Sequence, residues 1–459
     1  MKDWIQRLRA RCGELWWYTI LLFVAQRFGD AINMFVGLWL VPRYVTQDEL
    51  GAVLPLTQAV NFIALPLAVI SIPFMKFITV FTDSGEDGRA KAFVRDVFLA
   101  VGAMAVVSFA IAYFALPLIF ERIKVTSGSL GILVVAIAVL GASSSIFGYA
   151  VQGFRMYSAT IWIQVLQAPL RLILVLVAMP FRALSGYMVG QASGPIVQIA
   201  TALVAFRRRF GRAVRPAPYW QAYGRAICRY TLPFAIWTVV GTVAASLDTL
   251  VIRHRLPEVE SAGYYMLTRF TEIASYLGLA VTGFLFPMVA SRAATDATAL
   301  RLLRQSIVGA VLGGGAVVAL LSAFGRPLLG LLPEWSAYAP LAGLFPVIGV
   351  TTVLVAVMTC LVTYETAQGR FGFLWWAAPV CAAKSVLLYA VTSYPYFEGK
   401  IPAGLYAFVD ALAPRSLKFA AIYLLVSQIL LLAGFAPALR RAFARGPVPA
   451  SGPAADDMV

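Results

Sequence analysis

Long runs of apolar residues, each about the length of a membrane-spanning helix, dominate the pattern along this chain. Such a helix needs roughly 20 mostly apolar residues. Twelve stretches meet that requirement: 15–41, 52–75, 97–120, 129–151, 159–181, 184–206, 231–252, 264–290, 305–324, 338–364, 372–394 and 415–437. The first is too long for a cleaved signal peptide and is not followed by a small-residue cleavage site, so we expect it to remain as a helix. The pattern predicts an all-α polytopic membrane protein.

Polar segments divide the twelve spans into two equal halves. Residues 1–206 hold spans one to six, and residues 231–437 hold spans seven to twelve. Between them, 207–230 is basic and aromatic, so we expect an amphipathic connector in the lipid headgroup region. Residues 438–459 are rich in Pro, Ala and Gly in their last part and are expected to form a largely disordered cytoplasmic tail. Two six-span halves are the usual organisation of secondary transporters.

Composition supports the membrane assignment. The chain is 61% hydrophobic and 13% charged, with a mean hydropathy of +0.82, whereas soluble domains are about 45–50% apolar and about 25% charged. These values exclude a soluble enzyme, a disordered protein and a secreted disulfide scaffold.

The formal net charge of +16 is explained largely by topology. Most Lys and Arg residues fall on the side of the N-terminus, including the arginine cluster at 207–215, which assigns both termini to the cytoplasm. Attraction to anionic lipids at that face accounts for the excess, so no nucleic-acid partner is expected.

Metal, cofactor and nucleotide chemistry find no support in the sequence. The chain has one histidine and four widely separated cysteines: His254, Cys12, Cys228, Cys360 and Cys381. This inventory lacks the ligand spacing of a metal site or a catalytic Cys/His pair. It also lacks the phosphate-binding G-x-x-x-x-G-K-[ST] sequence. We therefore expect no cofactor, and transport driven by a potential, an ion gradient or later use of the product.

Several segments resemble bacterial lipid-linked oligosaccharide flippases. They are GLWLVPRYVTQDELGAVLPLTQAV (37–60), YAVQGFRMYSATIWIQVLQAPLRLILVLVAM (149–179), YTLPFAIWTVVGTVAASLDTLVI (230–252) and ESAGYYMLTRFTEIAS (260–275). Together they are similar to the polysaccharide-transport branch, of Wzx type, of the multidrug/oligosaccharidyl-lipid/polysaccharide exporter (MOP) superfamily. The resemblance implies two six-helix bundles in a V, related by a pseudo-twofold axis, around a central cavity that opens alternately to each side. It also implies a cargo of undecaprenyl-pyrophosphate-linked glycan.

Ionisable residues inside spans are costly and therefore mark candidate functional sites. In the first span Arg27, Asp30 and Asn33 follow at intervals of three and lie near the midplane. Arg27 could hold a pyrophosphate while Asp30 keeps it ionised or exchanges a proton. The alternative is a self-neutralising pair that faces a neighbouring helix. The resemblance implies a working Arg/Asp pair in this helix.

The fifth span carries a polar stripe. Gln164, Gln167 and Arg171 occupy one helical face, and two amides with a guanidinium suit sugar hydroxyls and phosphate. The same residue types also serve as polar helix–helix contacts in lipid.

The second half contributes four further ionisable residues. Arg269 and Glu272 lie close to the outer end of span eight, where snorkelling to the interface is the alternative, and the resemblance implies that Arg269 is a cavity arginine. Lys384 lies mid-membrane without a nearby acid in sequence, so it must face a cavity, water or a partner helix. Asp248, near the outer end of span seven, is interpreted as interfacial or capping in preference to coupling. Asp30, Glu272 and Asp248 are the candidate coupling residues.

These interior charges sum to a basic lumen, which favours an anionic lipid pyrophosphate over a cationic drug. The sequence therefore predicts a flippase that moves an O-antigen, exopolysaccharide or capsule repeat unit from the inner to the outer leaflet. Polysaccharide polymerase or glycosyltransferase machinery is a candidate partner, and a monomer is expected. The alternatives are a drug/cation antiporter of the same superfamily and a membrane enzyme acting on lipid-linked sugars. The enzyme is disfavoured because the longest outer loop, 395–414, offers only Glu398, Lys400 and Asp410 as charged side chains.

Overall fold

The protein is helical throughout the part described by the computed structural model. That part comprises residues 14–123, 128–210, 216–278, 285, 289, 296–393 and 417–443, and it contains no strand. Within it, nine helices are long and apolar enough to cross a membrane, or ten if the bent pair at the C-terminal end counts as one span. This confirms the prediction of an all-α, multi-pass membrane protein.

The helices of the first half form six successive passes. They are α2 (Glu14–Phe35) with η1 (Val36–Leu40) and α3 (Val41–Tyr44); α4 (Gln47–Ile63) with α5 (Leu65–Asp83); α6 (Asp87–Ile123); α7 (Gly128–Gly153); α8 (Tyr157–Ala178); and α9 (Ala183–Gln191) with α10 (Ser193–Phe210). Apolar runs form helices in lipid because every backbone polar group must be bonded within the segment. The start of α4 is fixed by a capping box, in which Thr46 and Glu49 each bond the backbone N–H of the other.

The second half repeats this plan. Its passes are α11 (Trp220–Arg255); α12 (Glu258–Gly278); α14 (Asp296–Leu329); η3 (Ala339–Leu344) with α16 (Phe345–Ala367), reached through the short α15 (Pro333–Ser336); α17 (Leu374–Ser393); and α19 (Leu417–Ala433) with α20 (Ala436–Phe443), bent by 65°. The inner part of the predicted span 264–290 lies mostly outside the described residues. The outer loop 395–414 does so entirely.

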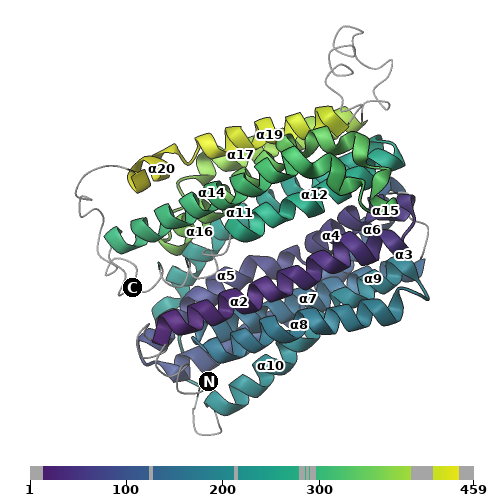
Figure 1. The fold of residues 1–459 in the computed structure, drawn as a ribbon. Coiled ribbons are helices and arrows are strands. Elements are labelled where there is room, and N and C mark those ends of the chain that lie inside the picture. The colour runs from purple at the N-terminus through teal and green to yellow at the C-terminus, as the bar shows by residue number, and fades with distance from the viewer. Residues whose placement is uncertain are drawn as a thin grey trace, which may run out of the picture.

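The two halves are separate groups of helices in space. In Figure 1, α2 to α10 pack together in the lower part of the view, and α11 to α20 pack together in the upper part. The first residues of α2 and the last residues of α20 lie at the same end of the bundle, on the left of Figure 1. We call this the proximal end, and the opposite end, with α3 and α15, the distal end.

Two segment boundaries differ from the sequence prediction. Within the expected connector 207–230, residues up to Phe210 continue α10, residues 211–215 lie outside the described part, and Trp220 already begins α11. Tyr219 and Tyr223 are buried against Phe81, with ring centroids 6.1 and 5.0 Å away. Hydropathy missed this extension because the packing is aromatic and the intervening residues are basic. Similarly, residues 438–443 of the expected tail belong to α20, and 444–459 lie outside the described residues.

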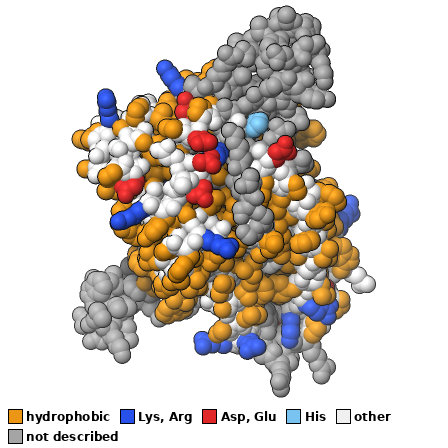
Figure 2. All heavy atoms as spheres, turned by 90° about the vertical axis from the view of Figure 1, so that its right-hand side faces the viewer, with side chains coloured by type: hydrophobic (Ala, Val, Ile, Leu, Met, Phe, Trp, Pro, Cys, Tyr) orange, Lys and Arg blue, Asp and Glu red, His pale blue; other side chains and the backbone are white. Residues whose placement is uncertain are grey.

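The halves are joined at the distal end by a group of contacts that we call the distal clasp. The Asp48 carboxylate pairs with the guanidinium of Arg253, which is only 2% exposed. Ser261 Oγ donates to the Gly51 carbonyl over 3.3 Å, and Tyr265 and Trp335 donate to the carbonyls of Gly37 and Leu38. Figure 2 views this end, where acidic side chains gather beside apolar ones. The clasp closes the distal end between the halves.

Gly186 is expected to be essential for packing in the first half. A Cβ there would lie 2.5 Å from the Ala178 carbonyl carbon and the Met179 nitrogen, both of them backbone atoms that cannot turn away. Gly186→Ala is therefore expected to destabilise the protein by about 1–3 kcal/mol and to lower the midpoint of thermal unfolding in detergent. Gly102→Ala is the control, because no atom lies within 4 Å of its Cβ position. Equal midpoints for the two variants would contradict the packing argument.

Candidate functional site

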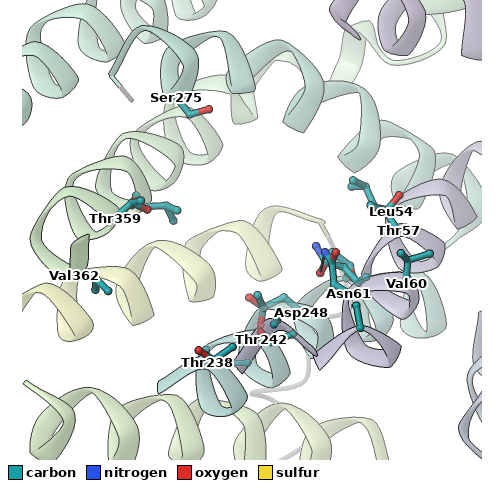
Figure 3. A pocket seen from close by; sticks show the side chains of 18 of the residues that line it. Leu54, Thr57, Val60, Asn61, Thr238, Thr242, Asp248, Ser275, Thr359 and Val362 are labelled. Atoms are coloured by element: carbon teal, nitrogen blue, oxygen red, sulfur yellow. Dashed lines mark hydrogen bonds between the residues drawn. The ribbon is translucent and has the colours of Figure 1, made fainter. Parts of the chain in front are cut away.

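A cavity of about 1180 Å³ lies between the two halves. Its wall is formed by α4, α5, α7, α9 and α10 from the first half and by α11, α12, α16, α17 and α19 from the second. Most polar side chains in the wall are uncharged hydroxyls and amides, among them Thr57, Gln58, Asn61, Thr238, Thr242 and Gln428. Figure 3 shows Thr238, Thr242 and Asp248 along α11 and Asn61 on α4 at the same part of the cavity. The wall is thus rich in hydrogen-bonding groups and poor in charge.

Small residues give α7 its concave face toward the cavity. Gly141, Ser144 and Ser145 line the wall directly. One turn further on, the Gln198 amide lies where a side chain at Gly148 would begin, since a Cβ there would be 1.8 Å from Gln198 Nε2. The sequence of α7 thereby supplies both room and a polar surface.

Three ionisable side chains line the cavity: Asp248, Glu272 and Lys384. Lys384 on α17 forms an ion pair with Asp248 on α11, and their side chains are 4% and 12% exposed. The requirement that Lys384 face a cavity or a partner helix is thus met, since it does both. Asp248, which the sequence analysis interpreted as interfacial or capping, lies within α11 in the cavity wall. The two members of this ion pair, Asp248 and Lys384, are 136 residues apart along the chain.

The remaining charged candidates lie beside the cavity, where α2 meets α8 and α12. We call Arg27, Asp30, Asn33, Arg171, Arg269 and Glu272 the arginine network. Arg27 pairs with Asp30 at 3.0 Å and also donates to the Tyr276 carbonyl of α12. Arg269 pairs with Glu272 at 2.8 Å, and Glu272 accepts a further bond from Tyr276. Arg269 packs against η1 at Gly37, so it points into the contact between the halves.

Arg171 joins the network from α8. It donates to Asn33 Oδ1 over 2.9 Å and to the Tyr187 hydroxyl over 3.3 Å. Tyr187 also interacts electrostatically with Arg269. One turn earlier on α8, Gln167 donates to Gln164 over 2.9 Å. The contacts of α2 with α8 and α12 therefore bring together the guanidinium groups of Arg27, Arg171 and Arg269, which come from three different helices.

The three guanidinium groups share an unusual feature. The Nε–H of Arg27, of Arg171 and of Arg269 is buried and has no hydrogen-bond partner among the described residues. A buried donor without a partner is costly. Three such donors in one region leave the network able to bind an added group that accepts hydrogen bonds.

The structure thus divides the residues predicted from the sequence between two places. Asp248, Glu272 and Lys384 line the cavity; Arg27, Asp30, Asn33, Gln164, Gln167, Arg171 and Arg269 do not. The cavity wall therefore lacks three of the four bases expected in a basic lumen. Substrate binding and coupling by all ten residues stay predictions.

The sequence analysis overlooked four amide side chains that line the cavity: Gln58, Asn61, Gln198 and Gln428. The criterion that singled out Gln164, an amide inside an apolar span, applies to each of them.

No group of three or more His, Cys, Asp or Glu residues suited to hold a metal ion occurs in the described part of the chain.

Comparisons with known proteins identify the fold. No family model matches the chain, and a search of curated proteins gives no match. Solved structures do match. A MATE transporter in a straight conformation aligns with a TM-score of 0.61 at 15% identity, covering 92% of this chain and 94% of that one. An inward-facing multidrug-resistance MATE transporter of the MOP superfamily aligns at 0.57 and 14%, covering 92% and 98%. A MOP-superfamily transporter from Pyrococcus furiosus, described as having a binding pocket of reversed polarity, aligns at 0.59 and 14%, covering 93% and 95%. The chain therefore has the MATE-like fold of this superfamily, with twelve spans in two bundles, as the sequence predicted.

Proposed function

We propose that this protein is a flippase that carries a polyprenyl-pyrophosphate-linked oligosaccharide across the membrane. The observation that carries the proposal is the polar part of the cavity wall, in which uncharged hydroxyl and amide side chains are spread among apolar ones and far outnumber the charged side chains. Pockets for drug-like ligands are predominantly apolar and aromatic with few polar groups. A wall of many neutral donors and acceptors instead complements the hydroxyl groups of a glycan.

The arginine network supplies the site for the pyrophosphate. Guanidinium groups bind phosphate oxygens with paired hydrogen bonds and retain their charge at any physiological pH. Arg27, Arg171 and Arg269 provide three such groups, each with a buried and unpartnered Nε–H, against two carboxylates. Glu272 belongs to the network and also lines the cavity. A lipid-linked sugar would thus bind with its pyrophosphate in the network and its glycan in the adjoining cavity.

Transport would follow alternating access between two bundles. The proximal end faces the cytoplasm of a bacterial inner membrane, with its basic residues next to anionic lipid, and cargo moves toward the distal side. Asp30, Glu272 and Asp248 are the candidates for ion coupling. The protein acts as a monomer without a cofactor and without catalysing a reaction, beside polysaccharide polymerase or glycosyltransferase machinery.

A drug/cation antiporter is the second candidate. It is favoured by the multidrug transporters among the solved structures of this fold and by the two acids against one base in the cavity wall. Asp248, however, is already neutralised by Lys384, which leaves only Glu272, itself paired with Arg269. Neither carboxylate is without a cationic partner.

Reconstitution decides between the two functions. In proteoliposomes the protein is expected to accelerate translocation of an undecaprenyl-pyrophosphate disaccharide at least tenfold over empty liposomes, measured by access of an added sugar-modifying enzyme to the opposite leaflet. Uptake or efflux of ethidium, a cationic drug, is expected to equal that of empty liposomes. The reverse result would replace the flippase with the antiporter.

A further inference from the structure

The wall of the cavity formed by α11, α17 and α19 contains two unused hydrogen-bond acceptors. Asp248 bonds Lys384 through Oδ2, whereas its Oδ1 is buried and has no hydrogen-bond partner among the described residues. Gln428 Oε1 on α19 is in the same situation. Both side chains line the cavity. Two buried oxygens without donors are costly to a fold unless a ligand supplies the donors.

The Lys384 side chain, which is the cationic group of this wall, is held in place. Lys384 is 6% exposed and its ammonium is paired with Asp248. The Tyr423 hydroxyl donates to the Lys384 backbone carbonyl over 3.2 Å, which joins α19 to α17 at Lys384. The pair is neutral as a whole, so the wall presents free acceptor atoms without a net charge.

We propose that Asp248 Oδ1 and Gln428 Oε1 form a subsite that accepts hydrogen bonds from two hydroxyl groups of an uncharged sugar in the cargo. This inference rests on the proposed function and specifies its glycan. A hydroxyl group donates a hydrogen bond, which is what both atoms lack. A uronate carboxylate has no hydrogen to donate to either oxygen, and the pairing of Asp248 with Lys384 leaves no net negative charge to attract a metal cation. The subsite therefore selects neutral sugars over acidic sugars and over ions.

Binding of three defined lipids to the protein in nanodiscs tests the subsite. The probes are undecaprenyl pyrophosphate without sugar, the same lipid with a neutral disaccharide, and the same lipid with a terminal glucuronate. Wild type is expected to bind the neutral disaccharide lipid about tenfold more tightly than the bare lipid, the factor that one hydrogen bond to a charged group supplies. The glucuronate lipid is expected to bind less tightly than the neutral one.

Two variants remove the acceptors without leaving a buried charge. Asp248→Leu with Lys384→Met removes both members of the ion pair together and leaves no acceptor at position 248, and Gln428→Met replaces the amide by a side chain of similar size. The first is expected to lose most of the tenfold gain and the second a smaller part of it, because the bond to the Asp248 carboxylate is charge-assisted and the bond to the Gln428 amide is not. The dissociation constant of each variant for the bare lipid is expected to stay within twofold of wild type. The matched controls lie outside the cavity: Arg95→Gln with Asp96→Asn, an exposed ion pair on α6, and Gln305→Met, an exposed amide on α14. Both controls are expected to keep the gain.

The outcomes separate this inference from the proposed function. If wild type binds the bare lipid but gains nothing from the disaccharide, the subsite is wrong and the flippase stands. If wild type binds neither lipid, both fail. Retention of the gain in both variants, tighter binding of the glucuronate lipid, or a gain that requires sodium would each overturn the subsite. Should the double variant not fold, Gln428→Met decides the matter alone.

Discussion

Removing the guanidinium groups of Arg27 and Arg171 is expected to weaken binding of undecaprenyl pyrophosphate by about two to four orders of magnitude. A hydrogen bond to a charged group contributes about 1.5–3 kcal/mol, so each lost guanidinium corresponds to about a tenfold to a hundredfold loss of affinity. Both groups keep a buried, unpartnered Nε–H. The dissociation constant in nanodiscs measures the effect, and flux of the disaccharide lipid is expected to fall with it.

The variants must avoid leaving a lone carboxylate in the membrane. Arg27 is paired with Asp30, so Arg27→Gln is combined with Asp30→Asn, which removes both charges together. Arg171 has neutral partners, Asn33 and Tyr187, and is replaced by Gln alone. Comparable unfolding midpoints for these proteins and wild type establish that the fold is kept.

Two further substitutions sharpen the result. Arg171→Lys keeps the positive charge but not the planar fork, so it is expected to recover only part of the affinity. Arg326→Gln removes an exposed arginine at the distal end of α14 and is expected to bind like wild type. Wild-type affinity in the combined Arg27, Asp30 and Arg171 variant would show that the network is a structural contact between helices and not a binding site.

The arrangement of the arginine network could be predicted in part from the sequence. Arg27, Asp30 and Asn33 recur every three residues, which places them on one face of α2, and the structure shows that face against α8 and α12. In lipid, the backbone polar groups must form hydrogen bonds within their own segment, so an apolar run of sufficient length forms a helix. The positions of spanning helices along the sequence can therefore be predicted from hydropathy. The cost of burying charge then identifies the residues that need a partner.

The partner itself could not be predicted from local sequence. Lys384 has no acid within its own helix, and it reaches Asp248 only because α17 packs on α11. Likewise, hydropathy cannot separate a charge that lines a cavity from one that lies between helices, because both are buried. For this reason the sequence predicted a single basic lumen. The structure instead has a cavity whose wall carries few charges and, beside it, the arginine network.

The distal clasp provides the second large prediction, because Gly51 leaves no room for a side chain. A Cβ at this position would lie 2.8 Å from Arg253 Nη1 and 2.8 Å from Ser261 Oγ. Arg253 is almost fully buried and held by Asp48, so it cannot move aside without breaking the contact between the halves. Gly51→Val is therefore expected to disfavour the state that is closed at the distal end by about 2–3 kcal/mol, a shift in population of about 30-fold to 150-fold.

Labelling of a cysteine placed at Thr249 measures this shift. Thr249 is buried and lines the cavity wall on α11. In a background without Cys12, Cys228, Cys360 and Cys381, a membrane-impermeant maleimide added at the distal side is expected to react at least tenfold faster in Gly51→Val than in the parent. Gly102→Val is the matched control, since its Cβ position is open, and is expected to leave the rate unchanged.

An independent weakening of the clasp should act in the same direction. Asp48→Asn removes the charge that pairs with Arg253 without adding volume, so it is expected to raise the labelling rate by a smaller factor than Gly51→Val. Flux of lipid-linked sugar is expected to fall in Gly51→Val, because a carrier biased toward one state returns slowly to the other. An unchanged labelling rate in both variants would mean that the distal contacts do not limit opening. The barrier to alternating access would then lie elsewhere, at the proximal contacts where Tyr219 and Tyr223 pack on Phe81.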